Sequence, residues 1–201
     1  MRVLSFILSS IFHPIFVPLL GFLLLYSFSG YTLYLPEDVF WFSVLVIVQF
    51  TILIPIGVIY FLYWRKKISS IQLSVREERP LPLVINLMSY AVSFVIFRYL
   101  NFPHIIVSFF GAIVVSATLA MLMSLTYKIS LHMIAWGTLL GVVLAFALGI
   151  GKDLHFLVSL IILVTGFVAT ARLWLNEHDL KQIGYAWLSS SVVSFLIMIY
   201  I

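Results

Sequence analysis

The chain has 201 residues, of which 64% are hydrophobic and 9% are charged, and its mean hydropathy is +1.21. Soluble domains do not have this composition, so the chain is an integral membrane protein. The sequence contains no cysteine, which excludes disulfide bonds and thiol chemistry. Its net charge of +4 suits contact with anionic lipid headgroups, and we expect membrane lipids, not nucleic acid, as partners.

Seven apolar runs follow one another along the chain, each close to the ~20 residues that a helix needs to cross a bilayer. They predict a single all-α domain over residues 1–201, a polytopic membrane helical bundle with six or seven transmembrane helices. The predicted spans are residues 3–29, 39–64, 83–99, 105–126, 133–150, 154–171 and 183–201.

Two of these runs contain residues that bear on helix packing. The first is interrupted by His13, Pro14 and Pro18. Because proline removes a backbone donor, this run is either a kinked span or a re-entrant segment. We interpret His13 as a residue packed at the kink rather than one that lines a polar cavity. Gly137 and Gly141 in the fifth run have the spacing of small residues on a helix packing face.

Three loops are unusually polar: residues 65–80, 127–132 and 171–182. They follow the second, fourth and sixth spans, so all three lie on the same face of the membrane, as one composite site requires. Ionisable groups this close to lipid are costly and indicate a functional site. The last loop holds five charged or titratable residues between two uncharged runs, namely Arg172, Glu177, His178, Asp179 and Lys181.

The residues of these loops favour an anion over a metal ion. Arginine forks match phosphate oxygens, and histidine can act as a nucleophile or a proton donor near neutral pH. Clustered cations repel a metal and the sequence has no HExxH motif, so we expect no metal and no other cofactor, although carboxylates for a metal are present. The candidate residues are Arg76, Arg79, Lys128, Ser130, His132, Arg172, His178 and Lys181.

In order and spacing, the three loops resemble the three motifs of the type-2 phosphatidic acid phosphatase superfamily, a family of membrane lipid phosphatases. The first family motif is Lys, six residues, Arg-Pro, and here Gln72 precedes Arg79-Pro80 by the same spacing. The second is Pro-Ser-Gly-His, and here it reads Ile-Ser-Leu-His, ending at His132. The third is Ser-Arg, five residues, His, three residues, Asp, and here Arg172, His178 and Gln182 match it in spacing.

This resemblance implies a metal-free hydrolase that removes phosphate from a lipid phosphomonoester or pyrophosphate. His178 would form a phosphohistidine, His132 would protonate the leaving group, and Gln182 would orient the nucleophile in place of the family's aspartate. Gln72 replaces the family's lysine, so one cation is missing and a neighbouring cation would have to compensate. The residues expected to hold the phosphate are Arg79, Arg172, Ser130, Lys128, Arg76 and Gln72.

Other interpretations stay open. Because Gln72 and Gln182 depart from the motifs, the chain could be a degenerate member that binds a phospholipid headgroup without turnover. It could also be a small membrane transporter or assembly protein, with ordinary loop cations that anchor headgroups. The expected location is a bacterial inner membrane. Most of the lysines and arginines lie on the motif face, which favours a cytoplasmic site, whereas family members commonly act from the other side.

Overall fold

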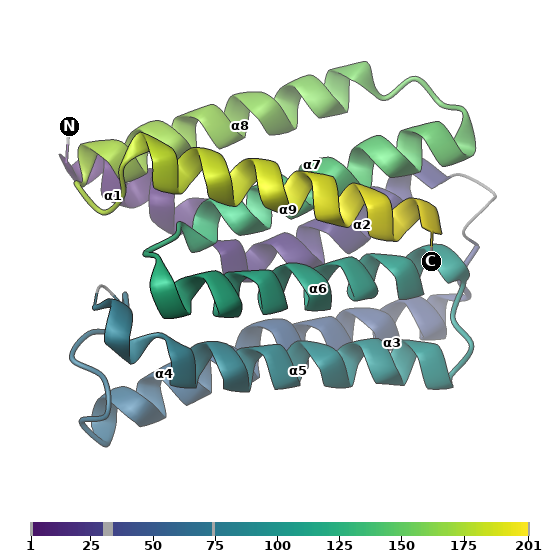
Figure 1. Ribbon diagram of the computed structural model, residues 1–201. Helices are drawn as coiled ribbons and strands as arrows, with labels where there is room; N and C mark the ends of the chain where they lie inside the picture. Colours follow the sequence, from purple (N-terminus) through teal and green to yellow (C-terminus); the bar gives the residue numbers. More distant parts are fainter. Residues whose placement is uncertain (1, 30–33, 74, 201) are drawn as a thin grey trace.

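The computed structural model describes residues 2–29, 34–73 and 75–200, so Ser74 in the first motif loop lies outside the described residues. Within these ranges the chain is helical and forms no strand. Seven helical segments are long and apolar enough to cross a membrane, and they lie side by side along a common direction (Figure 1). The predicted all-α, multi-pass membrane bundle is therefore confirmed, with seven candidate spans.

The first two spans are broken helices. The first consists of α1 (Arg2–Ile11), the short 3₁₀ helix η1 (Pro14–Phe16) and α2 (Val17–Ser29). The second consists of α3 (Glu37–Ile47), the π-helical stretch η3 (Val48–Leu53) and α4 (Ile54–Trp64). Pro14 and Pro55 lie at these irregularities, because a proline cannot donate the backbone bond that a continuous helix needs.

The remaining five spans are continuous helices. They are α5 (Pro80–Tyr99), α6 (His104–Thr126), α7 (Leu131–Ile150), α8 (His155–Trp174) and α9 (Leu180–Tyr200), with the 3₁₀ turn η4 (Arg76–Glu78) before α5. Pro80 begins α5, where its missing N–H costs nothing. Gly151 ends α7 with a φ of 60°, a left-handed conformation that favours glycine.

The core is centred on α7, which is the most buried of the seven spans. Its Gly137 and Gly141 lie directly against α9, where an added Cβ would overlap the hydroxyl groups of Ser190 and Ser194 and the backbone of Trp187 and Ser191. Small residues at this contact let the two helices approach closely. The predicted packing face at Gly137 and Gly141 is thus confirmed.

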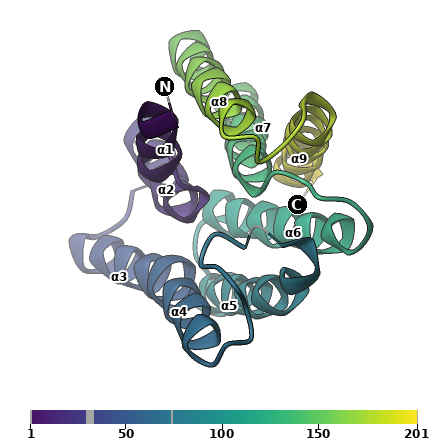
Figure 2. The same ribbon diagram turned by 90° about the vertical axis from the view of Figure 1, so that its left-hand side faces the viewer.

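The three polar loops meet at one end of the bundle. Figure 2 looks onto this end, where the α4–α5, α6–α7 and α8–α9 connections come together. Helix α1 begins at the same end (Figure 1). The expectation that the loops share one face is therefore confirmed.

Candidate functional site

A cavity of about 600 Å³ opens beneath the three loops, between the first span and α4, α5, α6 and α7. Its two ends differ in chemistry. Near the loops the lining is polar and charged, with Gln72, Arg79, His132, Arg172, Glu177 and His178. Deeper in the bundle most of the lining is apolar, with Leu83, Leu87, Ile113, Ile134 and Ala117 among its side chains. The cavity is therefore polar at one end and apolar at the other, which matches the charged head and the apolar tail of a lipid.

His178 lies at the polar end, in the loop between α8 and α9. Its Nδ1–H donates a hydrogen bond of 2.9 Å to Oε1 of Gln182, and only 8% of the residue is exposed. An amide oxygen can only accept, so Nδ1 carries the proton and the lone pair is on Nε2. The ring is therefore held with a nucleophilic nitrogen free.

The position of Gln182 follows from how α9 begins. Asp179 precedes the helix, and its Oδ1 accepts the backbone N–H of Gln182 at 2.8 Å. Oε1 of Gln182 in turn accepts the backbone N–H of Asp179 at 3.4 Å. This reciprocal pair is a capping box, which fixes the glutamine side chain beside His178. The predicted orienting contact between Gln182 and His178 is present.

The surroundings of His178 keep its ring neutral. Burial lowers the pKa of His178 to about 4, and the positive charges of Arg172, Arg79 and Lys128 lower it as well, against a raising contribution from the Gln182 hydrogen bond. Cations near an imidazole disfavour its protonated form. At neutral pH the side chain is therefore in the form that can attack phosphorus.

Arg79 links two of the three loops through hydrogen bonds to their backbone carbonyls. It is 3% exposed, its Nε donates to the carbonyl of Leu73 at 2.8 Å, and its Nη1 donates to the carbonyl of Ile129 at 3.0 Å. Burial lowers the pKa of Arg79, and the nearby Glu177 carboxylate raises it. Arginine stays protonated under such shifts, so the cavity keeps this charge.

Arg172 has an unused donor. Its Nη2 lies 3.7 Å from Oε2 of Glu177, but its Nε is buried and has no hydrogen-bond partner among the described residues. A buried charged donor without a partner is costly and rare in folded proteins. Because Arg172 lines the cavity, its guanidinium group places a positive charge beside any anionic ligand bound there.

The other predicted phosphate-binding residues occupy different places. Gln72 lines the cavity. Lys128 is not among the lining residues, and its Nζ lies 3.9 Å from Oε2 of Glu177. Ser130 lies just before α7 and is fully buried, and its Oγ has no partner among the described residues. Arg76 is half-exposed and not part of the lining, because it bonds to the carbonyl of Thr126 at 2.9 Å and to Glu77.

His132 lines the cavity from the first turn of α7. Its Nε2 donates to the carbonyl of Ser9 at 3.1 Å, and Trp136 Nε1 donates to the carbonyl of Phe12 at 3.1 Å. The last carbonyls of a helix have no partner within it, and α1 ends at Ile11. His132 and Trp136 therefore replace backbone donors at the break of the first span.

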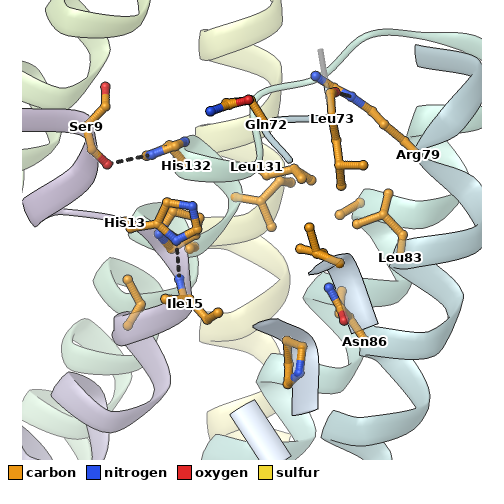
Figure 3. A pocket seen from close by; sticks show the side chains of 18 of the residues that line it. Ser9, His13, Ile15, Gln72, Leu73, Arg79, Leu83, Asn86, Leu131 and His132 are labelled. Atoms are coloured by element: carbon orange, nitrogen blue, oxygen red, sulfur yellow. Dashed lines mark hydrogen bonds between the residues drawn. The ribbon is translucent and has the colours of Figure 1, made fainter. Parts of the chain in front are cut away.

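The interpretation of His13 as a packed residue that does not line a cavity was wrong. Its ring lines the cavity and contacts His132 edge to face, with ring centroids 5.4 Å apart (Figure 3). The sequence feature that could have indicated this position is an ionisable residue inside an apolar run and next to a proline. Ser9, Asn86 and Ser116 also line the cavity, each with a buried side-chain atom that has no partner in the described part of the chain, and the motifs did not indicate them.

Comparisons of the chain with models of known families, with curated proteins and with solved structures find no match. The function must therefore be argued from the site. Over residues 2–29, 34–73 and 75–200 the structure contains no cluster of three residues suited to hold a metal ion. What the cavity brings together is a neutral imidazole whose Nε2 has no hydrogen-bond partner among the described residues, one buried and one half-buried arginine, two further histidines and an apolar chamber.

Proposed function

We propose that this protein is a membrane lipid phosphatase that removes phosphate from a lipid phosphomonoester or pyrophosphate. The observation that carries the proposal is the position of Arg172. Arg172 lines the same polar end of the cavity as His178 and Arg79, above an apolar chamber, and its buried Nε has no hydrogen-bond partner among the described residues. An anionic headgroup would bind to the guanidinium group, and the lipid tail would occupy the chamber.

The first chemical step would be attack by Nε2 of His178 on phosphorus. A bond between nitrogen and phosphorus forms while the bond from phosphorus to the lipid oxygen breaks. Arg79 and Arg172 would stabilise the negative charge on the phosphoryl oxygens. Gln182 would hold Nδ1–H and so keep the ring oriented throughout.

The leaving oxygen needs a proton, and His132 is the proposed donor. Its Nε2–H bonds to the carbonyl of Ser9, so Nδ1 of the neutral ring would take the proton of a monoprotonated phosphate group and pass it to the leaving oxygen. Water would then attack the phosphohistidine, release inorganic phosphate and restore His178. Gln182 cannot neutralise positive charge on His178 as a carboxylate would, so turnover is expected to be slower than with aspartate or glutamate at this position.

The test is phosphate release from a panel of lipid monophosphates and pyrophosphates by purified protein, with a chelator present. Wild type would be compared with His178→Ala and with His155→Ala, a histidine at the exposed start of α8, at the opposite end of the bundle. We expect release by wild type and His155→Ala and none by His178→Ala. Absence of release from every substrate, with a folded protein that still binds phospholipid, would replace the phosphatase by a headgroup-binding protein.

A further inference from the structure

The break in the first span fixes the chemical state of His13. The backbone N–H of Ile15 donates to His13 Nδ1 at 3.3 Å, so the histidine caps the helix η1 that follows it. A backbone N–H can only donate, which makes Nδ1 the accepting nitrogen and leaves the proton of the neutral ring on Nε2. The cap therefore locks His13 as a neutral imidazole with one N–H to donate.

This donor is open to the cavity. The side chain of His13 is exposed and lines the cavity, and no described contact takes up its Nε2–H. His132 differs, because its Nε2–H is committed to the carbonyl of Ser9. The two rings contact each other edge to face, and in Figure 3 the ring of His13 lies directly below that of His132 on the same side of the cavity.

The depth of His13 decides which ligand atom it would meet. In Figure 3, Gln72, Arg79 and His132 lie toward the loops, Ile15 and Asn86 lie toward the interior, and His13 lies between these two levels. The nucleophile His178 comes from the loop end. In phosphoryl transfer the attacking and leaving atoms lie on opposite sides of phosphorus. The oxygen that joins phosphorus to the lipid would therefore point toward His13.

We propose that His13 is a further catalytic residue, which donates a hydrogen bond from Nε2 to the leaving lipid oxygen while His132 protonates it. This inference rests on the proposed function and adds a residue outside the three motif loops. No proton leaves His13, because loss of Nε2–H would produce an imidazolate. As the bond from phosphorus to oxygen breaks and negative charge develops on that oxygen, the hydrogen bond strengthens and lowers the barrier.

Two substitutions separate this role from that of a helix cap. In His13→Asn the side-chain oxygen takes the place of Nδ1, so the cap is kept and the donor is lost. In His13→Gln the amide N–H₂ reaches the place of Nε2, so a donor is kept and the cap is lost. We expect His13→Asn to melt like wild type and lose about 10²-fold or more in kcat, the size of one lost transition-state donor. We expect His13→Gln to melt lower and keep the greater part of the activity.

The leaving group provides the second readout. An alkyl lipid phosphate has a poor leaving oxygen, whereas an aryl phosphate with the same chain has a good one and needs less help. We expect His13→Asn to slow the alkyl substrate much more than the aryl substrate. A lipid phosphonate, which lacks the bridging oxygen, should bind to His13→Asn as tightly as to wild type.

Several results would overturn the role of His13. One is that His13→Gln is the less active variant, which would leave helix capping as the only role of His13. Another is an equal loss on alkyl and aryl substrates, or weaker phosphonate binding, which would mean that His13 only shapes the cavity. If wild type releases no phosphate from any lipid, the proposed function fails, and the catalytic role of His13 fails with it.

Discussion

The two faces of α7 differ in how they meet their neighbours. One face packs against α9 through Gly137 and Gly141 with no room for a Cβ. The other presents His132, Ala135 and Thr138 to the cavity. The same helix therefore serves as a rigid wall on one side and as the lining of a chamber on the other.

Several serine and arginine side chains differ in the same way. On α9, the hydroxyl groups of Ser190, Ser191 and Ser194 all bond to carbonyls of their own helix. Around the cavity, Ser116 Oγ and Arg172 Nε are buried without partners among the described residues. Each unsatisfied buried polar group costs about 1–3 kcal/mol, more if charged. The three serines of α9 are therefore satisfied within their helix, whereas Ser116 and Arg172 beside the cavity each carry an unsatisfied polar atom that lowers stability.

The largest expected effect is a loss of catalysis when a residue that lines the cavity is replaced. We expect Arg172→Gln to lower kcat/KM by about 10²–10³-fold, the cost of one lost oxyanion donor, with little change in melting temperature. Phosphate release and thermal unfolding in detergent would be measured together. The matched control is Arg76→Gln, at an arginine that does not line the cavity. An equal loss in both variants would contradict the placement of the site.

The packed face should respond in stability. A side chain at Gly141 would meet the backbone of Ser191 and Phe195, which cannot move aside without separating the helices. We expect Gly141→Leu to destabilise the protein by about 1–3 kcal/mol or more, seen as a lower melting temperature in detergent. Gly149→Ala is the control, because an added Cβ there has nothing within 4 Å. Unchanged melting of Gly141→Leu would argue against close packing of α7 on α9.

The pH profile tests the environment of His178. Its pKa is lowered from 6.5 to about 4, so the acid limb of kcat/KM, where His178 becomes protonated, should lie near pH 4. Because the unfolded chain protonates this histidine first, its contribution to stability is present above about pH 6.5 and is lost as the pH falls toward 4.

Replacement of Gln182 by glutamate keeps the capping box and adds a negative charge. A nearby carboxylate favours imidazolium, so Gln182→Glu should raise the pKa of His178, move the acid limb upward and increase kcat. Measurements of kcat/KM from pH 3.5 to about 8 would show the shift. An acid limb near pH 6.5 in wild type would contradict a buried, cation-flanked nucleophile.

The smallest expected effects are changes in stability of opposite sign, one at a residue that lines the cavity and one at a residue in the contact between α7 and α9. Ser116→Ala removes an unsatisfied hydroxyl, so we expect stability to stay equal or rise by up to about 1 kcal/mol. Ser194→Ala removes a satisfied hydroxyl, 2.6 Å from the carbonyl of Ser190, and should lower stability by about 0.5–1 kcal/mol. Thermal unfolding of both variants in the same detergent checks the difference, and equal shifts would argue that the faces do not differ.

Much of the fold was predictable from the sequence, because span length, apolar runs and loop parity are properties of the chain itself. The motif spacing also indicated that Arg79, His132, Arg172 and His178 would meet. Tertiary contacts were not predictable. Arg76 turns to the carbonyl of Thr126, and His13 enters the cavity only because the broken first span lies against α7. Motif spacing within a loop says nothing about which other span will form the opposite wall.

The central claim is that His178 carries the phosphoryl group during turnover. The most direct measurement is rapid denaturation of the protein during turnover of a lipid with radiolabelled phosphate. We expect label on the wild-type chain that survives alkali and is lost in acid, as expected for a phosphohistidine, and no label on His178→Asn. Steady release of phosphate with no protein-bound label, or label that persists in His178→Asn, would contradict the account.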